Sequence, residues 1–337
     1  MPARIEDVAA HAGVSIKTVS RVINGHTTVR PALRERIEAS IQELSYVPNA
    51  SARSLAGNRS HLVALLYDTP SAGFNYAMEM IVGVLQGCNE TPYNLVLRPF
   101  ELTDDTVALT ESFVSQRCPD ALILVPPYSN NAKLLQRLDE LGTRYATVSS
   151  KLRQSRIDVG SDERKAAAEM VEHLISLGHR RIGHITGAKG HGALTWRLNG
   201  YRDALRKAGI PYDESLVTPG DFMFASGVTG ARALLDLRHP PTAIFAANDD
   251  MACGVIREAY ERGLAVPRDL SVCGFDDTPM ATLVSPSLTT VHQPCRELGR
   301  LAAEHVLQSI RNPGMQQHIH VPYQLQLRAS TVSPGGR

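Results

Sequence analysis

From Leu62 onward, short apolar runs alternate with helical stretches, and this alternation restricts the chain to few folds. The apolar runs are LVALLY, YNLVLRPF, ALILVPP, YATVSS, RIGHITG, TAIFAAND and LSVCGFDD, and two of the helical stretches are ERKAAAEMVEHLISLG and WRLNGYRDALRKAG. Strands that alternate with helices predict parallel sheets covered on both faces. Because about 270 residues exceed one ordinary doubly wound unit, we expect two lobes with a cleft between them.

Polar residues close several of these apolar runs and are the first candidates for ligand contact. In parallel sheets, ligands bind outside the carboxyl ends of the strands. The residues at those ends are Asp68, Ser71, Tyr128, Ser149, Asn248 and Asp276. The pattern therefore predicts a polar site in the cleft.

The stretch RIEDVAAHAGVSIKTVSRVIN, residues 4–24, predicts two short helices around a glycine. The first helix has apolar residues at the spacing of a buried stripe, namely Ile5, Val8, Ala9 and Ala12. Gly13 suits the left-handed end of this helix, and Ser15 can cap a second helix that runs to about Ile23. If the second helix packs through its valines, its other face presents Ile16, Lys17, Ser20, Arg21 and Asn24.

The segment NASARSLAGNRS, residues 49–60, follows a third predicted helix that begins at Pro31 and ends before Pro48. Asn49 can cap a helix of about two turns that stops at Gly57. So short a helix is marginal in water, because the cost of nucleation is not recovered over few residues. We therefore expect a linker whose helix forms conditionally.

Charge and cysteine content limit the class of protein. The chain carries a net charge of +1, but residues 1–60 hold 8 Lys and Arg against 5 Asp and Glu, which leaves 27 against 29 for the remainder. Positive charge is thus concentrated on the short helices.

No apolar run approaches a membrane span or the core of a signal peptide, so we expect a cytoplasmic protein with no membrane partner. Five widely spaced cysteines suggest neither disulfides nor zinc.

Several segments together resemble the lactose-repressor (LacI) family of bacterial transcription regulators. They are IEDVAAHAGVSIKTVSRVIN, NASARSLAGNRS, SLGHRRIGHITG, RLNGYRDAL, FAANDDMACGVIREAYERGL and LSVCGFDDTPMATLVSPSLTTVHQP. The resemblance covers nearly the whole chain and rests on the order and spacing of these motifs. It implies an all-α helix-turn-helix headpiece joined to an α/β two-lobed core similar to periplasmic binding proteins, with parallel doubly wound sheets.

The resemblance also implies a domain organisation. We expect a DNA-binding domain at 1–48, a hinge helix at 49–60, an effector-binding and dimerisation core at 61–331 and a flexible tail at 332–337. Within the core, we expect one lobe at about 61–157 and 291–318 and the other at about 158–288 and 321–331. The C-terminal QLQLRASTVSPGGR lacks a leucine heptad, so we expect a homodimer rather than a tetramer held by a coiled coil.

In the headpiece, the resemblance implies that Ile16, Lys17 and Arg21 read base edges in the major groove. An arginine can fork onto guanine, a lysine can donate to the same atoms and an isoleucine can cover a thymine methyl group. Contacts that position the helix on phosphates are expected from Ser15, Thr18, Ser20 and Asn24. An ordinary solvated face remains the alternative for Lys17 and Arg21.

In the hinge, the family pattern places Leu55 as a wedge in the minor groove at the operator centre, with Arg53 beside it. The alternative is that Leu55 covers the end of the core domain.

In the core, the resemblance implies effector contacts for Arg197, Phe222, Asn248 and Asp276. A guanidinium fork, an aromatic face, an amide and a carboxylate suit a polyhydroxylated ring. Phe74, Tyr76 and Tyr128 are weaker candidates, equally suited to packing. Many relatives carry an aspartate where this chain has Ser149, which leaves the identity of the effector open.

The resulting prediction is a repressor of carbohydrate-utilisation genes whose affinity for double-stranded operator DNA is set by a small molecule, with a sugar as the expected effector. A purine or nucleoside that acts as a co-repressor is the alternative. A free solute-binding protein or an enzyme on the same core is disfavoured by the headpiece. We expect no catalytic site, cofactor or metal, because GAKGHG fits neither nucleotide-binding glycine pattern and the histidines lack metal-binding spacing.

Overall fold

The computed structural model describes residues 3–23, 28–46, 59–68, 74–101, 105–117, 119–152 and 155–335, apart from the side chains of Phe74 and Arg117. The chain divides into two compact units, Met1–His61 and Leu62–Arg337. Among the described residues, no helix is both long and apolar enough to cross a bilayer.

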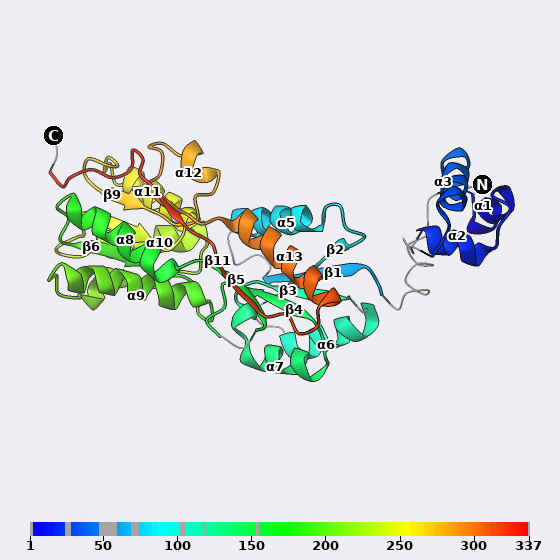
Figure 1. Cartoon of the computed structure of the whole chain (residues 1–337). Coiled ribbons are helices and arrows are strands. Elements are labelled where there is room, and N and C mark those ends of the chain that lie inside the picture. Colours follow the sequence, from blue (N-terminus) through cyan, green and yellow to red (C-terminus); the bar gives the residue numbers. More distant parts are fainter. Residues whose placement is uncertain are drawn as a thin grey trace. The chain divides into compact units, whose positions relative to one another are not determined.

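In its described residues, the first unit consists of three helices around a small apolar core (Figure 1). They are α1 (Ile5–His11), α2 (Ile16–Ile23) and α3 (Pro31–Glu43). The core is formed by Val8, Ala9, Ala12, Val19, Val22, Val29 and Ile37, with Leu33, Ile41 and Leu44 packed against it. The predicted end of the first helix and start of the second are confirmed: Gly13 has a φ of 62°, and Ser15 Oγ accepts a hydrogen bond from the backbone N–H of Thr18 at 3.3 Å.

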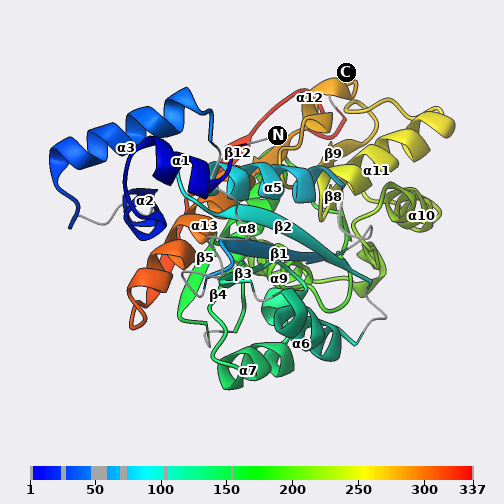
Figure 2. The ribbon, with the colours of Figure 1, turned by 90° about the vertical axis from the view of Figure 1, so that its right-hand side faces the viewer.

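The second unit contains a six-stranded parallel sheet in the order β11-β5-β4-β3-β1-β2. Its strands are β1 (Leu62–Asp68), β2 (Asn94–Phe100), β3 (Ala121–Leu124), β4 (Tyr145–Val148), β5 (Ile157–Gly160) and β11 (Gln317–His320). The helices on its faces are α5 (Phe74–Cys88), α6 (Thr106–Arg117), α7 (Ala132–Glu140) and α13 (Cys295–Arg311). Helices α5 and α13 cover one face, and α6 and α7 cover the other (Figure 2).

A second parallel sheet of the same unit has the order β7-β6-β8-β9. Its strands are β6 (Ile182–Ile185), β7 (Val217–Thr218), β8 (Ala243–Ala246) and β9 (Ser271–Cys273). Around it lie α8 (Glu163–Ser176), α9 (Gly192–Lys207), α10 (Phe224–Leu235), α11 (Asp249–Glu261) and α12 (Met280–Leu283). Apolar side chains of α8 and α9 pack on one face of this sheet, and those of α10 and α11 pack on the other.

Three crossover segments join the two sheets in the described residues of this unit. The chain leaves the first sheet after β5, returns to it after β10 (Thr290–His292), and leaves it again between β11 and β12 (Gln324–Gln326). Strand β10 pairs antiparallel with β12, and both contact α8, so these strands extend the second lobe. The distance between the two lobes can therefore change only if the three crossover segments change conformation.

Strand pairing and hydrogen bonds place the end of the first lobe and the start of the C-terminal tail a few residues away from the predicted positions. Strand β5, which starts at the predicted limit of the first lobe, pairs in the first sheet through Gly160. The segment expected to be a flexible tail begins with a fixed residue: Ser271 Oγ accepts a hydrogen bond from the N–H of Val332 at 3.0 Å, and Val332 O lies 2.8 Å from His179 Nε2. This anchor was not predictable from sequence, because its hydrogen-bond partners are distant in the chain.

Helices α5 and α13 approach each other closely because glycines line their contact. A Cβ atom at Gly83 would overlap the carbonyl oxygen of Arg296, and one at Gly299 would lie 2.6 Å from Met80 O. Both neighbours are backbone atoms, which cannot move away as a flexible side chain can. The packing of these helices therefore requires glycine at these positions.

We expect Gly83→Ala to lower the free energy of unfolding by about 1–3 kcal/mol, because the overlap with α13 outweighs the better helix propensity of alanine. Chemical denaturation measures the change. Gly314→Ala is the matched control, since a Cβ there meets open space. Equal stability of the two variants would contradict this account of the α5–α13 contact.

Candidate functional site

Helix α2 presents an exposed polar face in the first unit. Lys17 and Arg21 are exposed, and Ile16 is 46% exposed although it is apolar. Within the described residues, neither Lys17 nor Arg21 forms an ion pair, so both charges face solvent. The hydroxyls of Ser15 and Thr18 lie 2.8 Å apart in the first turn. Ser20 is half-buried on the same helix.

The other predicted DNA contacts, Asn24, Arg53 and Leu55, lie outside the described residues. The exposed side chains of α2 are thus the part of the predicted DNA interface that the structure places.

A small pocket lies between the two lobes of the second unit, next to the carboxyl ends of β3, β6, β8 and β9. Its volume is about 40 Å³. It is lined by Tyr76, Pro126, Glu163, His191, Ala193, Arg197, Phe222, Asn248, Asp276 and Gln293. We call it the Arg197 pocket. Because small-molecule sites usually enclose hundreds of Å³, a sugar enters only if the lobes separate or a side chain moves.

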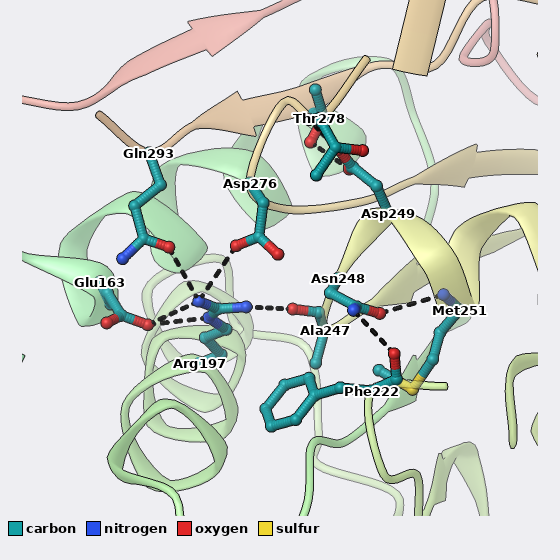
Figure 3. A network of polar contacts seen from close by, with 11 residues as sticks. Glu163, Arg197, Phe222, Ala247, Asn248, Asp249, Met251, Asp276, Thr278 and Gln293 are labelled. Carbon is teal, nitrogen blue, oxygen red and sulfur yellow. Dashed lines mark hydrogen bonds and ion pairs between the residues drawn. The ribbon is translucent and has the colours of Figure 1, made fainter. Parts of the chain in front are cut away.

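The guanidinium of Arg197 is the centre of a buried polar network (Figure 3). Its Nε and Nη2 contact Glu163 Oε2 at 2.9 and 2.8 Å. Nη2 also lies 3.4 Å from Asp276 Oδ1 and 3.3 Å from Gln293 Oε1, and Nη1 donates to the carbonyl oxygen of Ala247. The guanidinium carbon is 3.7 Å from the centre of the Phe275 ring, a cation–π contact.

Burial and charge act in opposite directions on this network. Burial favours the neutral form of Arg197, but the carboxylates of Glu163 and Asp276 outweigh it, so the pKa of Arg197 rises. Burial raises the pKa of Asp276 well above its usual range, and Arg197 opposes that shift. Two carboxyl groups therefore share one guanidinium, and the contact to Asp276 is the longer of the two.

Asn248 and Phe222 form the wall of the pocket opposite Glu163 (Figure 3). Asn248 Oδ1 accepts the N–H of Met251 at 3.0 Å and so caps α11, and Asn248 Nδ2 donates to Phe222 O at 2.9 Å. Phe222 has a φ of 70°, a left-handed conformation that costs energy for a bulky residue. Its ring lies where a Cβ on Gly187 would be, so a glycine at 187 leaves room for it.

Five residues predicted from sequence thus meet in one pocket: Tyr76, Arg197, Phe222, Asn248 and Asp276. Sequence reasoning missed Glu163, His191 and Gln293. An acidic residue at the start of a helix is usually solvated, so Glu163 gave no sign of its burial. His191 lies edge-on to Phe222 at 5.2 Å between ring centres. Burial first, and Arg197 second, lower the pKa of His191 to about 4, so it is neutral at physiological pH.

The remaining effector candidates whose side chains are described do not line this pocket. The Tyr128 hydroxyl donates to Phe100 O at 3.3 Å, and its ring packs edge-on against Phe100, which favours the packing interpretation. Ser149 is buried after β4 with a φ of 48°. Asp68 lines a separate small hollow with Tyr76 and Pro126, two residues that also line the Arg197 pocket.

Ser71 and the side chain of Phe74 lie outside the described residues. In the part of the chain that is described, no group of His, Cys, Asp and Glu side chains is arranged to hold a metal ion.

Comparisons with known proteins agree with this arrangement. Residues 4–49 match the bacterial regulatory proteins of the lacI family, and residues 171–331 match the periplasmic binding protein-like domain. The ribose operon repressor of Escherichia coli K12 is 36% identical over 321 residues, which cover 94% of this chain and 95% of the repressor.

Two solved structures share the architecture. One is the transcriptional regulator CelR in complex with cellobiose, 32% identical, with a TM-score of 0.74 over 97% of this chain and 99% of that one. The other is the Lac repressor dimer bound to operator and the anti-inducer ONPF, 28% identical, with a TM-score of 0.84 over 98% of this chain and 100% of that one.

We expect Arg197→Ala to lower the free energy of unfolding by about 3–5 kcal/mol near pH 8, because Glu163 and Asp276 lose their buried counter-charge. The loss of stability should be smaller near pH 5. A carboxyl group whose pKa is raised in the folded state binds a proton at a higher pH in the folded protein than in the unfolded chain. Its protonation therefore stabilises the folded state at low pH, and this stabilisation is lost as the pH rises through the raised pKa.

Chemical denaturation at the two pH values measures both effects. Arg206→Ala, an exposed arginine on the same helix, is the control and should change stability by less than about 0.5 kcal/mol. A loss for Arg197→Ala that is the same at both pH values would contradict the role assigned to the carboxyl groups.

Proposed function

The chain belongs to the lacI family of bacterial regulatory proteins, and we propose that it represses genes of carbohydrate use, with a sugar in the Arg197 pocket setting its affinity for operator DNA. The observation that carries this proposal is the pocket itself, where a guanidinium, two carboxyl groups, two amides and an aromatic ring converge between two lobes. Such a set offers paired hydroxyl contacts and an apolar face to a sugar ring. Ribose and cellobiose, named with the relatives, are the first sugars to test.

Asp276 is the best-placed partner for the hydroxyl groups of a sugar. Its contact to Arg197 is the longest in the network, so its carboxylate can exchange that contact for a ligand at little cost. Arg197 stays anchored by Glu163 when this happens. Phe222 can then cover the apolar face of the ring. Because the pocket is only about 40 Å³ in volume, sugar binding has to change the separation of the lobes or the position of Phe222.

In the headpiece, we assign base contacts to Ile16, Lys17 and Arg21, since these α2 side chains are exposed and uncommitted. Ser15, Thr18, Ser20 and Asn24 position the helix on phosphates, and Arg53 and Leu55 act in the minor groove. Because one such helix reads only one half-site of an operator, a second copy of the chain is needed to read the other half-site.

We therefore propose a homodimer that acts at the nucleoid in the bacterial cytoplasm, without enzymatic activity. Exposed apolar side chains on two helices support a dimer surface, namely Met78 and Leu85 of α5 and Met280 and Leu283 of α12. One hollow is lined by Glu79 of α5 and Thr282 of α12, so the two helices share a face. We expect sedimentation velocity to give a dimer at micromolar concentration. A stable tetramer, or a monomer that binds operator one-to-one, contradicts this assembly.

We expect Arg21→Ala to weaken binding to the preferred operator by about 1–3 kcal/mol and to leave binding to random duplexes nearly unchanged, because a base contact carries specificity. The operator is obtained by selection from random duplexes, and affinities are compared by gel shift at one salt concentration. Arg34→Ala on α3 serves as the control. Equal losses on both kinds of DNA make Arg21 a phosphate contact instead.

We expect Asp276→Asn to abolish the response of operator binding to sugar while the affinity for operator without sugar stays within about twofold of wild type, because Arg197 keeps its pair with Glu163. Gel shifts with ribose, cellobiose and a purine base measure the response. Asp236→Asn, at an exposed ion pair of the same lobe, is the control. A response to the purine base alone favours the co-repressor alternative and contradicts the sugar.

A further inference from the structure

Another hollow lies at the end of the first sheet that is opposite to the Arg197 pocket, where the strands begin. Its volume is about 200 Å³, and its lining includes Asp139, Thr143, Arg144, Tyr145 and Arg156. These residues surround the amino ends of β4 and β5. No predicted DNA or effector contact lines it.

Strand pairing brings the two arginines of this hollow together. Strands β4 and β5 are parallel neighbours, with Thr147 opposite Asp158. Arg144 directly precedes β4 and Arg156 directly precedes β5, so both emerge at the same edge of the sheet. The end of α13 forms another wall through Ser309.

Neither arginine is neutralised by a carboxylate. Arg144 Nε donates to Ser309 O at 3.3 Å, and Arg156 Nη1 donates to Pro313 O at 3.2 Å. Each guanidinium has five N–H donors, so these contacts orient the side chains and leave most donors available. Among the described residues, neither side chain forms an ion pair, whereas Arg137, nearby on α7, binds both Glu111 and Glu140.

One acidic residue lines the hollow. Asp139 is turned toward Tyr145, whose hydroxyl donates to Asp139 Oδ1 at 3.1 Å. With two guanidinium groups and one carboxylate, the lining keeps a net positive charge. Its size suits a small anion.

We propose that this hollow binds a phosphate group, through the guanidinium forks of Arg144 and Arg156. A planar fork matches two phosphate oxygens, and two forks at neighbouring strand ends match a tetrahedral anion better than a single lysine does. The phosphate belongs either to a free phosphorylated metabolite or to the DNA backbone. The hollow shares no lining residue with the Arg197 pocket.

Calorimetric titration of the full chain with inorganic phosphate, at constant ionic strength, tests the proposal. We expect saturable binding that is lost in Thr143→Glu, because the added carboxylate competes for the arginines, and retained in Thr143→Gln, which has nearly the same size. Arg156→Gln should weaken binding by about tenfold or more. Arg180→Gln, an exposed arginine outside the hollow, should leave it unchanged.

Absence of saturable phosphate binding overturns the proposal. So does binding that survives both Thr143→Glu and Arg156→Gln. If the arginines only fasten the end of α13, Arg156→Gln lowers the thermal midpoint while phosphate raises the midpoint of neither protein.

The source of the phosphate is resolved with a mixed-sequence DNA duplex. If the DNA backbone fills the hollow, Arg156→Gln reduces the salt dependence of duplex binding by about one ion, and inorganic phosphate competes with the duplex. If a free metabolite fills it, the salt dependence is unchanged while phosphate still binds the protein.

Discussion

The contact between Arg197 and its two buried carboxyl partners is the interaction on which the arrangement of the second unit depends. Arg197 is 4% exposed, and a guanidinium so buried is tolerable only with matched negative charge and satisfied donors. Its partners come from separate parts of the chain: Glu163 starts α8, Ala247 follows β8, and Asp276 follows β9. One side chain therefore holds together the strand ends of the second lobe.

The same network reaches the connections between the lobes. Glu163 stands just after the crossover that follows β5, and Gln293 stands in the crossover between β10 and α13. Arg197 contacts both. A ligand that takes Asp276 or Gln293 away from Arg197 thus acts directly on segments that set the separation of the lobes. This gives a physical route from an uncharged sugar to a change of conformation, since the ligand has different contacts in the two states.

Much of the fold was predictable because its signals are local. The glycine and serine that end and start the first two helices, and the apolar runs of seven strands, are visible in short windows of sequence. Strands β5, β7, β10 and β11 were missed because they are short or polar; β11, QHIH, is largely exposed at the sheet edge. Their positions are decided by long-range pairing rather than by local pattern.

The site was predictable in the second lobe and less so in the first. Asn248 and Asp276 lie shortly after buried strands, where the geometry of parallel sheets places ligand contacts. The same rule gave Tyr128, which instead packs on Phe100, because the rule identifies an edge and not the direction of a side chain. Glu163 comes soon after β5 and Gln293 directly after β10. Neither strand was recognised from the sequence, so these two site residues were not predicted.

The central claim is that the pocket and the DNA-binding helices are coupled, and thermodynamic reciprocity tests it most directly. The affinity of the active sugar is measured by calorimetry for the free protein and for the protein saturated with operator. The account predicts that the two sugar affinities differ by the same factor by which the sugar changes operator affinity. Equal sugar affinity in the two states, with a sugar that nevertheless fills the Arg197 pocket, would contradict it.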